Sequence, residues 1–508
     1  MDGLHHLRRL RKVLRGDVQG ALIISLKAMQ DTGKQIATNV VWKYLELFSV
    51  MGVQMVCTAI MARVLTPADY GVLGIVLVFS SLAEVFVNSG FSQTLIREKE
   101  VSRLDYSTFL YFNVGIAGLL YVLLYFASYV IADFYAQPIL SDVCKVAFIL
   151  LPVNALSIIQ MTKLQREVRF KKIFFISFTA SLLSAIIAII LAYIYRNVWA
   201  LVLQVVMTAL FRCLLLWVTS DFVPVLAFSV NTFKRYFQFS KNLMLSYLIG
   251  TLFNNIYSLV IGKAYSTTDL GYYSQASKIS NLASQTTTQV VQTVTYPILS
   301  QMNNNGCDIK SGYKKIISIT LILVGFVMAL LLSCAQDFFE LFMGSPTWRV
   351  AGTFFILMGV SGILYPLQSI NQNILMVTGN SKTILYLEIV RRSMMIIIVG
   401  VSLNFSINIF VFSLSIYSIA QLFLNLYYCG KPINYTVKEQ LKDSLPIFAR
   451  LVIMILLARG VGLICPIQTP FIRMLVSVIA CAILGFLLFW RQKDFQNLMM
   501  LVFARIKL

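Results

Sequence analysis

The sequence predicts an all-α protein that crosses a membrane about fourteen times, and three observations lead to this prediction. The chain has a mean hydropathy of +0.79, and 58% of its 508 residues are hydrophobic while only 12% are charged. A soluble domain carries about 25% charged residues. The apolar runs are about 20 residues long, which suits helices across a bilayer rather than the shorter alternating strands of a membrane barrel. The last of the three observations is that Lys and Arg concentrate in alternate loops.

The apolar runs define the predicted spans. The first six are 40–62, 72–96, 108–131, 145–162, 173–194 and 199–219, and the others are 242–262, 272–300, 316–333, 351–377, 384–402, 407–428, 446–464 and 472–490. Two of these are weak by hydropathy, because 272–300 is rich in Thr and Gln and 384–402 contains paired arginines. We keep both because the distribution of charge over the loops requires them.

The loop charges predict the orientation. Most of the 42 Lys and Arg residues lie in alternate loops and in the terminal segments, whereas the loops between hold only Arg63, Arg196, Lys263 and Arg349. Because cytoplasmic loops carry the excess of Lys and Arg, an even number of spans with both termini in the cytoplasm is predicted. The net charge of +21 then reflects topology and attraction to anionic lipid. Its scatter over short loops argues against a nucleic-acid partner.

The residues of common catalytic and metal sites are sparse. The two histidines are His5 and His6, and the eight cysteines form no CxxC pair, so neither a metal site nor a disulfide framework is predicted. The loops are short and contain no phosphate-binding glycine loop and no hydrolase motif. We therefore expect no catalytic residues and no cofactor, which favours a transporter or channel over an enzyme.

A segment of the first half recurs in the second. Residues 63–71 (RVLTPADYG) match 263–271 (KAYSTTDLG), and 151–154 (LPVN) match 365–368 (YPLQ) more weakly. Each pair occupies the same place in its half. Since each half has an even number of spans, two parallel six-helix lobes with a site between them are predicted, followed by two extra helices.

The limits of the predicted spans also divide the chain into domains. The basic segment 1–36 either lies on the inner leaflet as an amphipathic helix or is a tail that only sets the orientation. The remaining parts are an N-lobe at 37–219, an inter-lobe cytoplasmic linker at 220–240, a C-lobe at 241–428, the extra helices at 429–490 and a cytoplasmic tail at 491–508.

Three segments carry a family resemblance, namely 62–71 (ARVLTPADYG), 86–97 (FVNSGFSQTLIR) and 164–172 (LQREVRFKK). They resemble the polysaccharide transporter (Wzx-like flippase) branch of the multidrug/oligosaccharidyl-lipid/polysaccharide (MOP) superfamily. The resemblance implies a central cavity, alternating access and the bacterial inner membrane. It also implies an undecaprenyl-diphosphate-linked oligosaccharide as substrate, moved from the cytoplasmic to the outer leaflet. Polysaccharide polymerase or assembly proteins are the protein partners that this implies.

Embedded charges are the first candidates for substrate contact. A charge at the bilayer centre costs about 2.5–3.5 kcal/mol on insertion scales, so such residues tend to face a cavity or a partner. The basic candidates are Lys278, Arg212, Arg391 and Arg392, and the candidates for ion coupling are Glu46, Glu84 and Glu388. Local alternatives remain open: Lys43 can pair with Glu46, Arg212 can reach the interface, and Glu388 can neutralise one arginine and leave the other free for a diphosphate.

A polar stripe marks the span 272–300. Its members recur every three or four residues: Ser274, Lys278, Asn281, Gln285, Gln289, Gln292 and Tyr296. The stripe is either the wall of a wet cavity or a set of amides that hold helices together. Further amide candidates for a cavity are Asn254, Asn255 and Gln368, because amides suit sugar hydroxyls.

Three classes of function remain from the sequence. They are a flippase for lipid-linked oligosaccharide, a cation-coupled multidrug antiporter on the same fold, and a membrane enzyme or structural subunit. Basic residues within the spans favour the flippase, because a cavity for cationic drugs would be rich in carboxylates. Glu46 and Glu84 keep the antiporter open.

Overall fold

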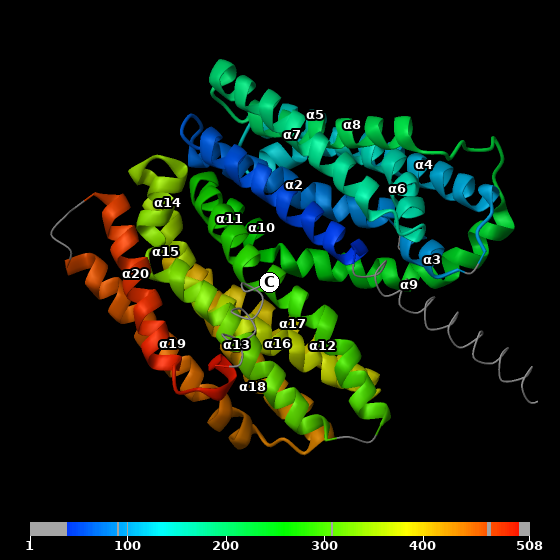
Figure 1. Ribbon diagram of the computed structural model, residues 1–508. Coiled ribbons are helices and arrows are strands. Elements are labelled where there is room, and N and C mark those ends of the chain that lie inside the picture. The colour runs from blue at the N-terminus through cyan, green and yellow to red at the C-terminus, as the bar shows by residue number, and fades with distance from the viewer. Residues whose placement is uncertain (1–37, 89–90, 99, 306–307, 465–468, 497–508) are drawn as a thin grey trace, which may run out of the picture.

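The computed structural model describes residues 38–88, 91–98, 100–305, 308–464 and 469–496. These residues form helices joined by short connections, and no strand occurs among them (Figure 1). The predicted all-α class is therefore confirmed. The segment 1–36 and residues 497–508 of the tail lie outside the described residues.

The helices form two bundles and an added pair (Figure 1). The first bundle contains the helix Thr38–Met61, α2 (Pro67–Asn88), α3 (Phe91–Arg97), α4 (Arg103–Phe134), α5 (Ile139–Ala147), α6 (Leu150–Arg166), α7 (Phe170–Tyr195) and α8 (Trp199–Thr219). The second contains α9 (Val230–Asn254), α10 (Ile256–Ala264), α11 (Thr267–Asn281), the π-helix η1 (Leu282–Thr286), α12 (Thr287–Asn304), α13 (Ile309–Ser333), α14 (Ala335–Met343), η2 (Pro346–Trp348), α15 (Arg349–Leu357), α16 (Gly359–Val377), α17 (Ser381–Ser402) and α18 (Ile407–Gly430). After η3 (Lys431–Ile433), α19 (Val437–Ile464) and α20 (Pro470–Phe489) form the added pair.

The described helices support a multi-pass membrane protein. Ten are long and apolar enough to cross a bilayer, and two bent pairs raise that number to as many as twelve. One pair bends by 43° between Asn254 and Ile256, and the other bends by 41° between Leu357 and Gly359. The two spans that are weak by hydropathy are helical, as α11–η1–α12 and α17, but they are too polar to count by composition. The number fourteen therefore stays a prediction.

One predicted span was wrong at its end. The sequence predicted one run over 72–96, whereas α2 ends at Asn88 and the short helix α3 begins at Phe91. α3 still contains Phe91, Leu95 and Ile96 among its polar residues, which is why hydropathy alone extends the span. The next helix has a clear start, because Ser102 and Asp105 form a capping box at the first turn of α4.

The two bundles meet along α2 and α11, and α9 lies across the first bundle, against α2, α3 and α4 (Figure 1). An aromatic cluster holds α9 there, since Phe233 and Phe237 pack with Phe91 and Phe112. The chain then bends at Asn255 and returns to the second bundle through α10. The two halves are thus joined through α9, which packs on the first bundle, and α10, which packs on both α2 and α11. The domain limits stay predictions.

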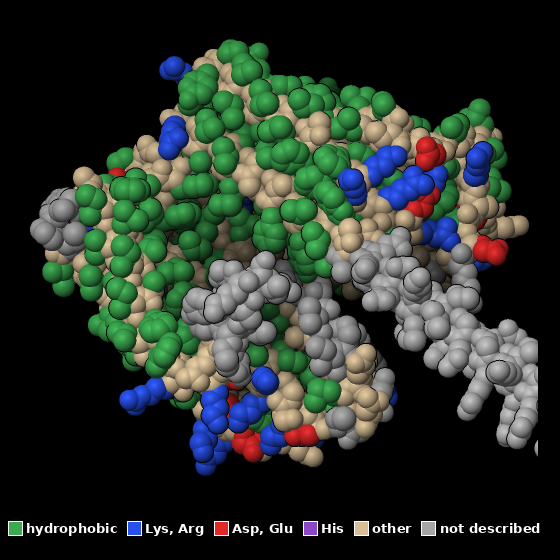
Figure 2. Space-filling model, viewed as in Figure 1, with side chains coloured by type: hydrophobic (Ala, Val, Ile, Leu, Met, Phe, Trp, Pro, Cys, Tyr) green, Lys and Arg blue, Asp and Glu red, His purple; other side chains and the backbone are tan. Residues whose placement is uncertain are grey.

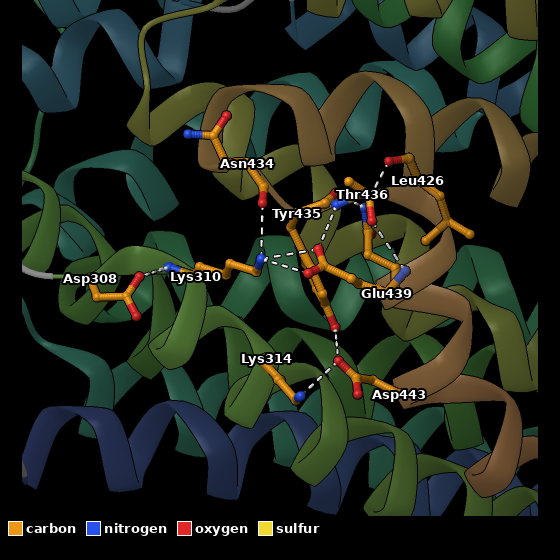
Figure 3. A network of polar contacts seen from close by, with 10 residues as sticks. Asp308, Lys310, Lys314, Leu426, Asn434, Tyr435, Thr436, Glu439 and Asp443 are labelled. Carbon is orange, nitrogen blue, oxygen red and sulfur yellow. Dashed lines mark hydrogen bonds and ion pairs between the residues drawn. The ribbon is translucent and has the colours of Figure 1, made fainter.

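Polar contacts fasten the added pair to α13 at one end (Figure 3). Lys310 pairs with Glu439 at 3.0 Å, and Lys314 pairs with Asp443 at 2.8 Å. The Tyr435 hydroxyl donates to Asp443 at 2.6 Å. Burial and this hydrogen bond raise the pKa of the Tyr435 phenol, so that it remains a donor. Each half-exposed ion pair of this kind stabilises the fold only slightly. The network as a whole fixes the position of the added pair against α13.

A second ionic cluster fastens the opposite end of the added pair. Asp337 of α14 accepts contacts from Arg349 at 3.3 Å and from Arg473 of α20 at 3.1 Å. Arg459 of α19 donates to Gln336 at 3.1 Å. Between these ends the outer face is apolar, and Figure 2 shows hydrophobic side chains over most of the visible surface with charged groups gathered near its edges. Apolar coverage this extensive needs lipid around it.

Candidate functional site

A cavity of about 830 Å³ lies between the two bundles, and the face seen in Figure 2 is hollowed where they meet. The first bundle contributes the helix Thr38–Met61, α2, α6 and α8, and the second contributes Asn255, α10, α11, η1 and α12. Small-molecule pockets enclose about 300–1,000 Å³. The cavity therefore has room for a large polar ligand.

Amide and hydroxyl side chains line much of this cavity. They include Gln54, Thr58, Gln204, Thr208, Asn255, Ser274, Asn281, Gln285 and Gln289. Side-chain amides both donate and accept hydrogen bonds, as sugar hydroxyls do. Such a wall can bind a sugar in several orientations without a fixed charge.

Lys278 brings a cation to the same wall. Its Nζ donates to Thr58 Oγ1 at 3.3 Å, and among the described residues no carboxylate lies within ion-pair distance of it. A hydroxyl orients an ammonium group but does not neutralise it. Because an embedded charge without a counter-charge is costly, this position favours an anionic ligand.

Glu84 and Arg212 meet the cavity from α2 and α8. Asn154 of α6 lies between them, donating to Glu84 Oε1 at 2.5 Å and accepting from Arg212 Nη2 at 2.9 Å. The same three residues line a second cavity of about 300 Å³ within the first bundle. Glu84 and Arg212 thus lie between the central cavity and the smaller one, where they place one negative and one positive group.

The predicted polar stripe divides after the π-helix η1. Ser274, Lys278, Asn281, Gln285 and Gln289 line the cavity, whereas Gln292 donates to the carbonyl oxygen of Ser369 on α16 at 3.0 Å. Gln289 and Gln292 both lie in α12, after η1, so the change of surroundings comes from the packing of α12 against α16. Both interpretations of the stripe therefore apply, the cavity wall as far as Gln289 and helix packing at Gln292. Nothing is described for the Tyr296 side chain.

Glu388 corrects the prediction for the paired arginines. The sequence predicted that Glu388 would leave one arginine unmatched, but its two carboxylate oxygens contact both, at 3.4 Å from Arg391 and 2.6 Å from Arg392. Arg391 is 3% exposed and also donates to Asn425 at 2.5 Å. The turn of a helix allows residues three and four positions on to reach one carboxylate. Neither arginine is among the residues that line the central cavity.

Three other predicted residues lie outside the central cavity. Asn254 is exposed beside the bend that Asn255 forms. Gln368 donates to the Ser418 carbonyl of α18 at 3.0 Å, which joins two helices. Glu46 pairs with Lys43 at 2.8 Å and accepts from Ser177 at 3.0 Å, so the local ion pair is present. Within the described ranges, no group of three His, Cys, Asp or Glu residues could hold a metal.

Several cavity residues that were not predicted have a readable signal in the sequence. Gln54 and Thr58 are four residues apart in an apolar helix, and Gln204 and Thr208 precede the predicted Arg212 at the same spacing along α8. Residues at this spacing share one helix face. Asn154 had been noted only as part of the internal repeat, because nothing in a single helix indicates a partner on another one.

Comparisons with known proteins agree with this architecture. Residues 60–351 match a protein-family profile described as "Polysaccharide biosynthesis protein". The chain is 23% identical over 360 residues to the teichuronic acid biosynthesis protein TuaB of Bacillus subtilis, which covers 70% of this chain and 74% of that protein. It is also 23% identical over 334 residues to the succinoglycan biosynthesis transport protein ExoT of Rhizobium meliloti, covering 66% of this chain and 67% of that protein.

A solved structure shares the fold. The lipid II flippase MurJ in an inward closed conformation superposes with a TM-score of 0.68, over 89% of this chain and 99% of that chain. The two sequences are 16% identical over this superposition. The likeness therefore concerns the arrangement of the helices.

Proposed function

The chain belongs to the polysaccharide biosynthesis protein family, and we propose that it is a flippase for a lipid-linked oligosaccharide. It would move an undecaprenyl-diphosphate-linked glycan from the cytoplasmic to the outer leaflet of the bacterial inner membrane. Alternating access of the cavity between the two bundles would carry the polar head group, while the polyprenyl tail stays in lipid. The product would supply surface polysaccharide export.

The observation that supports this proposal most directly is that Lys278 lies in a cavity of about 830 Å³ and has no carboxylate partner in the part of the chain that the structure describes. A diphosphate supplies the missing negative charge and accepts several hydrogen bonds. Asn281, Gln285 and Gln289 lie on the same helix wall, where they can bind the hydroxyls of the attached sugars. Together they match a ligand with an anionic end and a neutral polar end.

Glu84 is the proposed site of ion coupling. It lines both the central and the smaller cavity, so a cation or proton can reach it by a path separate from the substrate. Glu84 is also the observation that favours the second candidate function, a cation-coupled multidrug antiporter. The nearby Arg212 and Lys278 argue against that candidate, because two cations in the cavity repel a cationic drug.

Flipping by purified protein in liposomes tests the proposal. A polyprenyl-diphosphate oligosaccharide carrying a fluorophore on its glycan is placed in both leaflets, and an impermeant quencher reports which glycans become accessible. Protein-dependent loss of the protected fraction is expected. If that fraction remains protected while a cationic dye is taken up against a proton gradient, the antiporter is the correct function. A matched control is the variant Gly115→Ala, which adds a methyl group in open space.

Polysaccharide polymerase or assembly proteins are proposed as partners in the membrane. We propose that both termini face the cytoplasm, which places the basic loops of both bundles on the side where the lipid-linked glycan is loaded.

A further inference from the structure

The two repeated segments build the same local structure at the starts of α2 and α11. Before α2, the backbone N–H and the hydroxyl of Thr66 donate to Asp69 Oδ2 at 2.9 and 2.7 Å. Before α11, the Ser266 hydroxyl donates to Asp269 Oδ2 at 2.6 Å and accepts from the Asp269 backbone N–H at 3.0 Å. Each carboxylate lies in the first helical turn, where it offsets the positive end of the helix. The repeat therefore encodes two helix starts that are closed by the same Thr/Ser-to-Asp contact.

The glycine of each segment packs directly against the backbone at the start of the other segment's helix. A Cβ atom added to Gly71 would lie 1.7 Å from the carbonyl oxygen of Thr267, and one added to Gly271 would lie 1.8 Å from that of Pro67. No side chain fits at such distances, so only glycine permits this approach. The contact is reciprocal, because each bundle supplies both a glycine and a helix start.

The basic residue that opens each segment also reaches the opposite bundle. The Arg63 side chain packs on Gly344 at the end of α14, where an added Cβ would lie 2.4 Å from Arg63 Cγ. Lys263 donates to the carbonyl oxygen of Phe134 at the end of α4, and its Nζ lies 4.4 Å from the centre of the Phe134 ring. The repeat thus places a second pair of matching contacts around the glycines.

Trp348 fills the space beside these contacts. It is 1% exposed and packs edge-on against Tyr70 of α2, with ring centres 5.4 Å apart, and against Tyr272 of α11, at 5.7 Å. Tyr70 also lines the central cavity. The cavity extends from there along α2 to Glu84, a rise of about 20 Å at 1.5 Å per residue. The paired segments therefore stand at one end of the cavity.

We propose that segments 63–71 and 263–271 form a reciprocal clasp that closes the outer end of the cavity and opens in each transport cycle. The inference rests on the proposed alternating access. The glycine contacts join two helix starts through their backbones, and the surrounding side-chain contacts lie between helices that keep their own hydrogen bonds, so the bundles separate there without unfolding either one. Asp69 and Asp269 offset the repulsion of two positive helix ends held together.

Accessibility of one cysteine in the cavity tests the clasp. The eight native cysteines are replaced by serine, Asn281→Cys is introduced, and intact cells are treated with an impermeant maleimide from outside. Gly71→Leu and Gly271→Leu overpack the clasp, and labelling from outside is expected to rise roughly tenfold or more. The control is Gly115→Leu, which meets open space and leaves labelling at the reference level.

Trp348→Ala provides a test without overpacking, because it removes a ring that both bundles contact. Labelling from outside is expected to rise in this variant as well. If inserted leucine variants label no faster than Gly115→Leu, or label only from the cytoplasmic side, the clasp is not the outer gate. Where the leucine variants do not insert, unchanged labelling of Trp348→Ala overturns the proposal. The assay uses no substrate, so its result is independent of whether the cargo is a lipid-linked glycan.

Discussion

Lys278 and Thr58 meet across the two bundles, with the lysine Nζ 3.3 Å from the threonine Oγ1. The hydroxyl belongs to the helix Thr38–Met61 and the cation to α11. This contact fixes the position of the ammonium group without cancelling its charge. An anionic ligand that enters the cavity therefore meets a positioned ammonium group that no carboxylate of the described ranges neutralises.

Replacing Lys278 tests that role. A hydrogen bond to a charged group contributes about 1.5–3 kcal/mol, so Lys278→Ala is expected to reduce flipping of a lipid-linked glycan at low substrate by about tenfold or more. Lys278→Arg retains the charge and is expected to retain much of the activity. Thr58→Val removes only the orienting contact and should have the smaller effect. Normal flipping by an inserted Lys278→Ala protein would contradict an anionic cargo at this site.

Thiol labelling tests the division of the polar stripe. Cysteines at Asn281, Gln285 and Gln289 are expected to react with a water-soluble reagent because these residues line the cavity. A cysteine at Gln292 is expected to react slowly, since that side chain faces α16. Ala276, which is 0% exposed, provides the buried control. Equal protection of all five positions would mean that the stripe serves helix packing alone.

These two experiments concern features that the sequence predicts to different degrees. The stripe and the helices follow from periodicity, because spacing along one helix is visible in the chain itself. The change from cavity wall at Gln289 to helix packing at Gln292 is not visible, since it depends on the helix against which α12 packs. Glu388 was predicted to serve one arginine and serves two, although the spacing of three and four residues along one helix allows both contacts. The bridge through Asn154 joins three helices, and no single segment contains it.

Glu84→Gln tests ion coupling. The amide has almost the shape of the carboxyl group but neither titrates nor carries charge, so a proton or cation can no longer be exchanged there. Liposome flipping without a gradient is expected to persist, whereas stimulation by an imposed proton gradient is lost. Asn154→Leu removes the hydrogen-bonded link between Glu84 and Arg212. This variant should reduce both the flipping without a gradient and its stimulation by a proton gradient. If Glu84→Gln responds to the gradient as the unaltered protein does, coupling resides elsewhere.

Labelling of loops tests the predicted orientation. A cysteine at Lys171 is expected to be protected from impermeant reagents in intact cells and to react after the membrane is opened. A cysteine at Gln137 should react in both conditions, because it lies between α4 and α5 on the predicted outer side. The reverse pattern would place the basic loops outside and contradict the charge rule.

The paired arginines allow structure and substrate contact to be separated. Arg391 is 3% exposed and its planar group reaches both Glu388 and Asn425. Lysine cannot span two acceptors in this way. Arg391→Lys is therefore expected to lower the free energy of unfolding by about 1.5–3 kcal/mol, the contribution of a charged hydrogen bond. Thermal unfolding in detergent measures this, and the exposed Arg196→Lys serves as control.

Arg392 should respond differently to the same substitution. Its side chain is 20% exposed, pairs with Glu388 at 2.6 Å and lies 5.0 Å from the centre of the Phe253 ring, contacts that an ammonium group can largely reproduce. We expect Arg392→Lys to unfold close to the unaltered protein. Its flipping rate then decides the role of the pair. A rate that falls while stability is retained means that this arginine contacts the diphosphate during transport, as the sequence suggested. A normal rate, with loss of flipping only in the destabilised Arg391→Lys, means that the pair holds α17 to α18 and that the head group is bound in the central cavity alone.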